Sequence, residues 1–215
     1  MIEARDLEEA IKQLEEPYRG ILEDVLPEYK KNKKILVFEK ALDKEIFGAL
    51  WNKVEGLKGK DREIVERIIG SEFDITNVMT LLRCKAEGVE MKEIKEFFLP
   101  YTFAFDYNAE AVRAAMMAED VASTIRLLPD SEYKEALMVA ISQYEMEKSL
   151  IPFENSLRKL FLKTIRRTLR GYPINIGTII GFLYLKEVEI KNLCAIAVCK
   201  ENNIPPEEIM KFVMI

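Results

Sequence analysis

The chain has 215 residues, of which 49% are hydrophobic and 32% are charged, and its net charge at pH 7 is −5. This composition is typical of a folded globular protein and gives no overall electrostatic attraction to nucleic acid. The absence of histidine excludes serine–histidine and cysteine–histidine catalysis and removes the commonest metal ligand. The abundance of helix-forming residues relative to glycine and proline favours an almost all-α fold.

Amphipathic segments and helix-stop signals predict several helices in the first half of the chain. Ser71 followed by Asp74 resembles a capping box, so we expect a new helix to begin at Ser71 and to end at Gly88. The other predicted helices of this half lie near residues 4–15, 18–30, 38–55 and 61–69.

The second half begins with an aromatic connection over residues 98–116, which we expect to lead into a helix from about residue 109. A long basic helix should end at Gly171. Near the C-terminus, Pro205 and Pro206 suit the first turn of a short helix that follows a tight turn. The connection is too apolar for a loose linker, so we expect the two halves to pack together.

The chain contains an internal repeat. Residues 38–98 align with residues 153–213 without a gap and share 14 identities over 61 positions, where average residue usage gives roughly four. Similarity extends upstream, because YRGIL at 18–22 aligns with YKEAL at 133–137. We therefore predict two similar helical-bundle repeats of about 115 residues, residues 1–105 and residues 106–215.

The three cysteines, Cys84, Cys194 and Cys199, lack the spacing of a disulfide or zinc framework, so we expect buried free thiols in a reducing compartment. We expect no metal and no cofactor. The N-terminus has no apolar signal segment, and the longest apolar run, residues 174–185, is too short to span a bilayer. A cytoplasmic protein without direct membrane insertion is expected.

An asparagine recurs in the repeated phrase. Asn192 precedes Cys199 by one heptad, and Asn77 precedes Cys84 by the same distance, in helices predicted to be apolar on most sides. A buried amide must be hydrogen-bonded, so Asn192 should bond backbone or a partner such as Glu187 or Glu189. A structural role that fixes helix register and a role in ligand binding both fit; the lack of proton-transfer chemistry favours the structural role.

The basic helix that ends near Gly171 is the main candidate for a partner contact. The corresponding helix of the first repeat lacks this charge, so the repeated fold does not require it; a merely solvated face is the alternative. The arginines of this candidate contact are Arg158, Arg166, Arg167 and Arg170, with Lys159 and Lys163 on the same helix. A second basic cluster, over residues 30–34, suits a helix C-terminus as well as a phosphate or membrane surface.

The C-terminal segment GYPINIGTIIGFLYLKEVEIKNLCAIAVCKENNIPPEEI, residues 171–209, resembles the signature of the C subunit of archaeal and bacterial A-type (V-type) rotary ATP synthases. That family is related to the d subunit of vacuolar ATPases. The matching features include Gly171 with Pro173, the Lys186–Glu187 step, Asn192–Leu193 and the closing Pro-Glu-Glu-Ile turn. The phrase DITNVMTLLRCKAEGV of the first repeat is similar to the corresponding phrase of the preceding family repeat.

The resemblance implies an all-helical, funnel-like protein of three similar domains around a pseudo-threefold axis. It implies a non-catalytic subunit whose partners are the central-stalk subunits and the membrane rotor ring of a rotary ATPase that transports protons or sodium. The chain departs from this pattern in having two repeats and in having Cys194 where the family often has a basic residue. A stand-alone helical scaffold or adaptor is the alternative. A helix-turn-helix DNA reader is disfavoured, because the short last helix is acidic at its start and apolar beyond.

Overall fold

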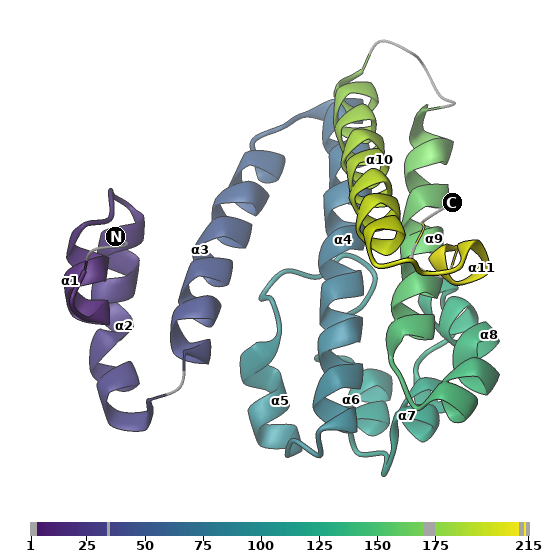
Figure 1. Ribbon diagram of the computed structural model, residues 1–215, viewed down its shortest axis with the longest axis horizontal. Coiled ribbons are helices and arrows are strands. Elements are labelled where there is room, and N and C mark those ends of the chain that lie inside the picture. Colours follow the sequence, from purple (N-terminus) through teal and green to yellow (C-terminus); the bar gives the residue numbers. More distant parts are fainter. Residues whose placement is uncertain (1–3, 34, 170–174, 211–212, 214–215) are drawn as a thin grey trace. The chain divides into compact units, whose positions relative to one another are not determined.

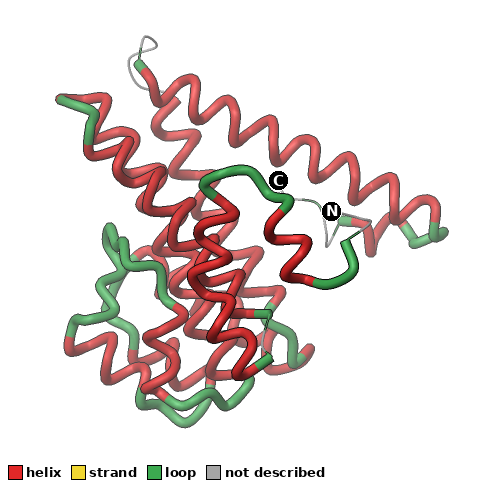
Figure 2. The backbone as a smooth tube through the Cα atoms, turned by 90° about the vertical axis from the view of Figure 1, so that its left-hand side faces the viewer, coloured by secondary structure: helices red, strands yellow, loops and turns green. Residues whose placement is uncertain are grey.

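The computed structural model describes residues 4–33, 35–169, 175–210 and 213. Throughout these residues the regular secondary structure is helical, with no strand (Figure 2). The predicted all-α fold is therefore confirmed. The described chain forms two compact units, one of residues 1–56 with 99–101 and one of residues 57–98 with 102–215.

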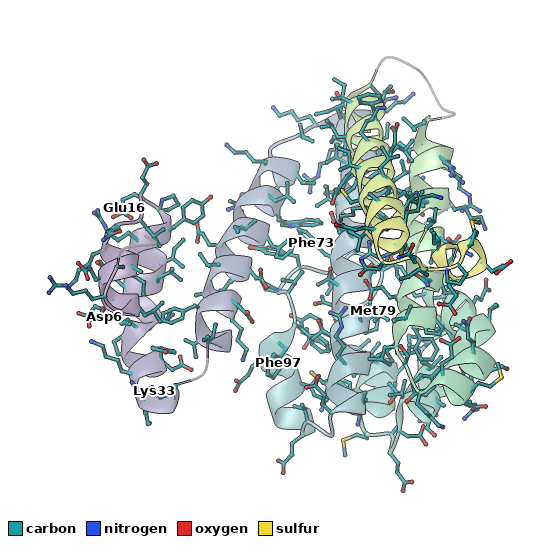
Figure 3. All side chains as sticks on the ribbon, viewed as in Figure 1. Asp6, Glu16, Lys33, Phe73, Met79 and Phe97 are labelled. Atoms are coloured by element: carbon teal, nitrogen blue, oxygen red, sulfur yellow. The ribbon has the colours of Figure 1, made fainter. Side chains whose placement is uncertain are left out.

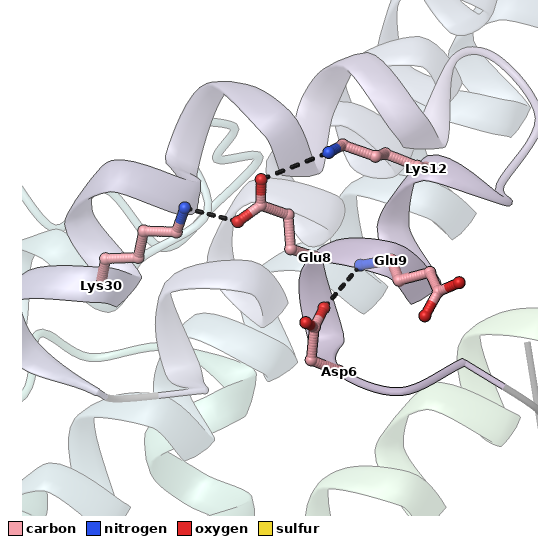
Figure 4. Close-up of polar contacts among 5 residues, drawn as sticks. All are labelled: Asp6, Glu8, Glu9, Lys12 and Lys30. Carbon is pink, nitrogen blue, oxygen red and sulfur yellow. Dashed lines mark hydrogen bonds and ion pairs between the residues drawn. The ribbon is translucent and has the colours of Figure 1, made fainter.

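The first unit contains three helices: α1 (Leu7–Lys12), α2 (Tyr18–Asn32) and α3 (Leu36–Glu55). The Asp6 carboxylate caps α1 by accepting a 2.8 Å hydrogen bond from the backbone N–H of Glu9 (Figure 4). Ile11, Leu22 and Phe38, one from each helix, form a buried cluster in this unit, and Val54 of α3 is buried as well.

The segment 99–101 also belongs to the first unit. Its Tyr101 ring lies 5.7 Å from the ring of Trp51 on α3, centroid to centroid. A Cβ added at Gly48 would lie 3.1 Å from the Tyr101 hydroxyl, so glycine leaves the room that this ring occupies. One face of α3 is thus covered by a segment that lies far away in the sequence.

The second unit contains the remaining helices, and α4, α9 and α10 pack against one another (Figure 1). Phe73 and Met79, labelled on α4 in Figure 3, are buried. Much of the core lies between α4, α8 and α9, and includes Leu82, Leu137 and Phe153. The helices are α4 (Gly59–Ala86), α5 (Met91–Phe97), α6 (Glu110–Met116), α7 (Val121–Leu127), α8 (Glu132–Glu147), α9 (Ile151–Leu169), α10 (Ile176–Glu201) and α11 (Pro206–Ile209).

The capping box predicted at Ser71 is wrong, because α4 runs without interruption through that position. Ser71 and Asp74 are both buried in the middle of the helix. The Asp74 carboxylate accepts hydrogen bonds from the backbone of residues 103 and 104 instead of from its own helix terminus. Gly70 lies close to the same segment, since an added Cβ would stand 2.5 Å from the Phe103 Cβ. The glycine therefore permits a close approach of the segment to α4.

The predicted stop at Gly88 is confirmed. Gly88 has a φ of 68°, and the N–H of Val89 donates a 2.9 Å bond to the carbonyl of Cys84, which is a Schellman motif. The end of α10 has the same geometry: Asn203 has a φ of 56°, and Ile204 donates a 2.9 Å bond to Cys199. The helices predicted from about residue 109 and at Pro206 are also present. The predicted stop at Gly171 lies outside the described residues.

The helix boundaries recur along the chain at the spacing of the sequence repeat. The pairs α3 and α9, α4 and α10, and α5 and α11 begin within about two residues of a shift of 115. Left-handed residues end α2 at Lys33 and α8 at Lys148, and each repeat has an aromatic pair, Tyr29–Phe38 at 4.8 Å and Tyr144–Phe153 at 4.9 Å.

These correspondences support our proposal of two repeats, residues 1–105 and 106–215. The repeats are not the same as the compact units, because α4 and α5 belong by sequence to the first repeat and pack in the second unit. Neither unit therefore corresponds to a single stretch of sequence.

Candidate partner-binding surface

Helix α9 has one apolar side and one basic side. Its apolar side is buried through residues that include Phe153, Leu157, Leu162 and Ile165. On the opposite side Lys159, Lys163 and Arg166 follow the spacing i, i+4, i+7, so they share one face of the helix. All three are exposed, and none of them forms an ion pair within the described part of the chain. We name Lys159, Lys163 and Arg166 the cationic stripe.

Two of the predicted arginines, Arg158 and Arg167, are paired within the protein. Arg158 donates hydrogen bonds of 2.7 and 3.2 Å to the carboxylate of Glu154, one helical turn earlier. Arg167 lies 3.4 Å from the carboxylate of Glu132 on α8. Both ion pairs are partly exposed, so each contributes at most about 1 kcal/mol. The four predicted arginines therefore do not form one patch, and Arg170 lies outside the described residues.

The sequence holds the signal that separates these cations. Arg158 has an acid at i−4, which predicts a local ion pair, whereas the cationic stripe has no acid at i−4. This signal separates Lys159 and Lys163 from Arg158, but it does not separate them from Arg167, whose acidic partner Glu132 lies on another helix.

The basic cluster near residue 30 has partners within the first unit. The ammonium of Lys30 lies 2.5 Å from the Glu8 carboxylate, which also pairs with Lys12 at 3.4 Å (Figure 4). The hydrogen bond from Lys30 is the main reason that the pKa of Glu8 lies below its usual value. Lys33 ends α2, and its ammonium lies 5.6 Å from the centroid of the Tyr29 ring. Lys30 and Lys33 thus have contacts near the C-terminus of α2, and Lys34 lies outside the described residues.

Asp74 is a buried polar residue of the second unit with several hydrogen-bond partners. Its carboxylate accepts hydrogen bonds from the N–H groups of Phe103 at 2.8 Å and Ala104 at 2.6 Å, and from the Tyr133 hydroxyl at 3.0 Å. Burial raises the pKa of this carboxyl above its usual value, and the three donors partly oppose that shift. Burial also raises the pKa of the Tyr133 hydroxyl. Asp74 therefore ties α4 to the segment that follows α5 and to α8.

The polar residues Glu72, Tyr184 and Glu187 are among those that line a cavity of about 250 Å³ between α4, α9 and α10. The Tyr184 hydroxyl donates a hydrogen bond to the Glu72 carboxylate. Burial raises the pKa of Glu72, and the nearby carboxylate of Glu187 adds to that effect. Glu187 itself is exposed and pairs with Lys191 at 2.5 Å. Glu187 thus acts on Glu72 through its negative charge. The structural role that we predict for Glu187 remains a proposal.

The two repeated asparagines lie in different environments. Asn77 is fully buried in α4, whereas Asn192 is half-buried on α10 beside Arg166 and Leu193. The expectation that both helices are enclosed on most sides is therefore confirmed for α4 and wrong for α10. Helix α10 packs against α4 and α9 along one side, which includes Gly177, Gly181 and Tyr184, and leaves its other side exposed. The predicted register-setting role of both asparagines remains a proposal.

The cysteines also differ in burial. Cys84 and Cys199 are buried as predicted, but Cys194 is exposed, because it lies on the uncovered side of α10. The described residues contain no group of three or more cysteine or acidic side chains placed to hold a metal ion. Over the same residues, no helix is both long and apolar enough to cross a membrane.

The molecule is thus an all-helical protein whose most distinctive exposed features are a cationic stripe on α9 and an apolar face on α10. The ATP synthase (C/AC39) subunit family model matches residues 1–212, and the chain belongs to this family. The chain is 32% identical to the C subunit of the A-type ATP synthase of Methanosphaera stadtmanae over 218 aligned positions, which cover 100% of this chain and 56% of that protein.

Further relatives agree with this assignment. The C subunit of the A-type ATP synthase of Methanocaldococcus jannaschii is 30% identical over 97% of this chain and 52% of its own length. The same subunit of Methanothermobacter thermautotrophicus is 30% identical over 98% of this chain and 54% of its own length. The chain therefore spans just over half the length of these relatives. No solved structure matches it significantly.

Proposed function

We propose that this chain acts as a non-catalytic coupling subunit of an A/V-type rotary ATPase. In this role it links the central stalk to the membrane rotor ring, on the cytoplasmic side and peripheral to the membrane, in a machine that transports protons or sodium. Membership of the family supports the proposal. Because the chain spans only part of its relatives, the proposal concerns the surfaces of this part.

The observation that carries the proposal is the cationic stripe of α9. Its three cations share one exposed face, and the buried opposite face fixes the helix in the second unit. The corresponding positions of α3, Lys44, Gly48 and Trp51, carry one cation. The stripe is therefore an addition to the repeated fold, and its charge suits an acidic surface on a protein of the stalk or ring.

A stand-alone helical scaffold or adaptor is the second candidate function. The specific observation that favours it is the apolar face of α10, which exposes several large side chains. Such a face indicates protein contacts without indicating a motor. Recovery of partners other than rotary ATPase subunits would support this candidate.

Charge reversal of the stripe tests the coupling role. The double variant Lys163→Glu and Arg166→Glu should weaken assembly with purified central-stalk and ring subunits by at least about tenfold in Kd, because it replaces attraction by repulsion. Binding should be measured at two salt concentrations, since the wild-type interaction is expected to weaken with salt. Helicity should remain unchanged, because both side chains are exposed.

The matched control is the double variant Lys95→Glu and Arg113→Glu, which makes the same charge change at exposed positions on α5 and α6. The control should assemble like the wild type. Equal binding by the stripe variant and the control would remove the cationic stripe from the interface.

A further inference from the structure

Glu72 of α4 is a half-buried carboxylate that lines a cavity and forms no ion pair within the described part of the chain. The cavity has a volume of about 250 Å³ and lies between α4, α9 and α10, which pack against one another in the second unit (Figure 1). The carboxylate accepts a hydrogen bond from the neutral Tyr184 hydroxyl. A carboxylate in such a place is a suitable partner for the ammonium group of a ligand.

The lysine nearest to this carboxylate is bound to another acid. The ammonium of Lys191 lies 2.5 Å from the carboxylate of Glu187, and both residues line the cavity. These two opposite charges act on the pKa of Glu72 in opposite directions. The pair therefore does little to compensate the charge of Glu72.

The other end of the cavity has an excess of positive charge. Arg158 and Arg83 lie 2.7 Å and 3.6 Å from a shared carboxylate, that of Glu154. The two guanidinium groups carry about ten N–H donors, whereas one carboxylate accepts at most about four hydrogen bonds. The arginine side chains are 40% and 56% exposed, so a second carboxylate can approach them from solvent.

An apolar wall separates the two charged ends. Glu72, Ile75, Met79 and Arg83 follow the spacing i, i+3, i+7 and i+11 on α4, and all of them line the cavity. Eleven residues span about 16 Å along a helix axis. The apolar residues that line the cavity between these ends include Ile75, Met79, Leu162 and Val188. This wall suits an apolar chain that joins two charged groups.

Two aromatic rings stand beside the acidic end. The rings of Tyr184 and Phe161 both line the cavity and meet edge to face, with their centroids 5.2 Å apart. This packing fixes the Tyr184 ring, and with it the hydroxyl that donates to Glu72. Aromatic rings attract ammonium groups through their π-electrons. The rings and the carboxylate therefore favour the same ligand group.

We propose that this cavity binds a small, elongated zwitterion, with its ammonium group on Glu72 and its carboxylate beside Arg83 and Arg158. An apolar chain joins the two groups and packs along the wall between them. The cavity is smaller than the roughly 300–1,000 Å³ of pockets for drug-sized ligands, so the ligand is small. This binding site goes beyond the coupling role and does not depend on it, because it takes a small molecule instead of a stalk or ring protein.

Calorimetric titration of the purified 215-residue chain with ε-aminocaproate tests the proposal. This probe carries an ammonium group and a carboxylate at the two ends of an apolar chain, and its Kd should be in the millimolar range or below. Caproate lacks the ammonium group and hexylamine lacks the carboxylate. Each of them should bind at least about tenfold more weakly than the zwitterion.

Glu72→Gln tests the acidic end of the cavity. The amide keeps an oxygen that accepts the Tyr184 bond but removes the charge, so the Kd for ε-aminocaproate should rise at least about tenfold. Burial disfavours the charged carboxylate, as the raised pKa of Glu72 indicates, so thermal stability should not fall. The matched control is Glu63→Gln, the same charge change at an exposed position of α4, which should bind like the wild type.

Arg158→Gln tests the basic end. It should weaken the binding of ε-aminocaproate several-fold and leave the binding of hexylamine unchanged, because only the zwitterion has a carboxylate for this end. A variant that merely loosens the helices would weaken both probes equally.

Three results would overturn the proposal. The first is the absence of both heat and chemical-shift changes with ε-aminocaproate at about 10 mM. The second is an equal Kd for Glu72→Gln and Glu63→Gln, which would remove Glu72 from the site. The third is hexylamine binding as tightly as ε-aminocaproate, which would remove the basic end. Assembly with stalk and ring proteins is measured separately, so none of these results bears on the coupling role.

Discussion

At the scale of single residues, Asp74 shows how a polar side chain in the middle of a helix can organise its surroundings. Its carboxylate accepts bonds from two backbone N–H groups and a tyrosine hydroxyl, all from segments at least 29 residues away. Burial of the carboxylate is unfavourable, as the raised pKa indicates. The three donors offset that cost, and loss of the Asp74 carboxylate would leave these donors without their acceptor.

Replacement of Asp74 by alanine should therefore destabilise the protein. We expect Asp74→Ala to lower the free energy of unfolding by roughly 2–4 kcal/mol, because three donors lose one charged acceptor. Tyr133→Phe should cost about 1 kcal/mol, since it removes a single donor. Urea unfolding followed by circular dichroism measures both values. A loss for Asp74→Ala no larger than that for Tyr133→Phe would contradict the bridging role.

At the scale of helices, the sequence predicts the fold well where the signal is local. The stop at Gly88, the proline-initiated α11 and the helix from residue 110 follow from residues inside or next to each element. The continuity of α4 through Ser71 could not be predicted, because the partners of Asp74 lie at residues 103, 104 and 133. The exposure of α10 has a similar cause: identical periodicity is buried in α4 and exposed in α10, and only the neighbouring helices decide which.

The same limit applies to the candidate surface. The basic character of α9 is plain in the sequence, and the acid at i−4 explains why Arg158 is paired. The pairing of Arg167 could not be predicted, because Glu132 lies on another helix, 35 residues earlier. The spacing of Lys159, Lys163 and Arg166 predicts that they share one face of α9. Whether that face is exposed depends on which side of α9 packs into the core.

The contact at Gly70 gives a prediction for helix α4 as a whole. Gly70→Ala should raise intrinsic helix propensity by about 1 kcal/mol, yet the new Cβ would stand 2.5 Å from the Phe103 Cβ and 2.8 Å from its Cγ. Because Phe103 is held by Asp74 through its backbone, the segment cannot shift without cost. We expect a net loss of about 1–3 kcal/mol in the free energy of unfolding.

The matched control for this substitution is Gly56→Ala at the end of α3, where an added Cβ would have only ordinary contacts, at 3.5 and 3.6 Å. Its stability should change by no more than about 0.5 kcal/mol. Thermal unfolding of the two variants compares them directly. If Gly70→Ala proves as stable as Gly56→Ala, the close approach of residue 103 does not constrain α4.

At the scale of the whole molecule, the two compact units differ in the size of their cores. The first unit has three helices and buries residues that include Ile11, Leu22, Phe38 and Val54, whereas the main cluster of the second unit extends from α4 through α9. Apolar burial is the main favourable contribution to folding, so the first unit should unfold at the lower denaturant concentration.

The single tryptophan makes this difference measurable. Trp51 belongs to the first unit and contacts Tyr101 of the same unit, so its fluorescence reports on that unit. Far-ultraviolet circular dichroism reports chiefly on the second unit, which contains α4 to α11. In urea at low protein concentration, the fluorescence midpoint should lie below the circular dichroism midpoint.

Ile11→Ala should lower the fluorescence midpoint further and leave the main dichroism transition in place, because its side chain is buried in the first unit alone. Coincident midpoints in both proteins would show that the two units unfold as one cooperative body.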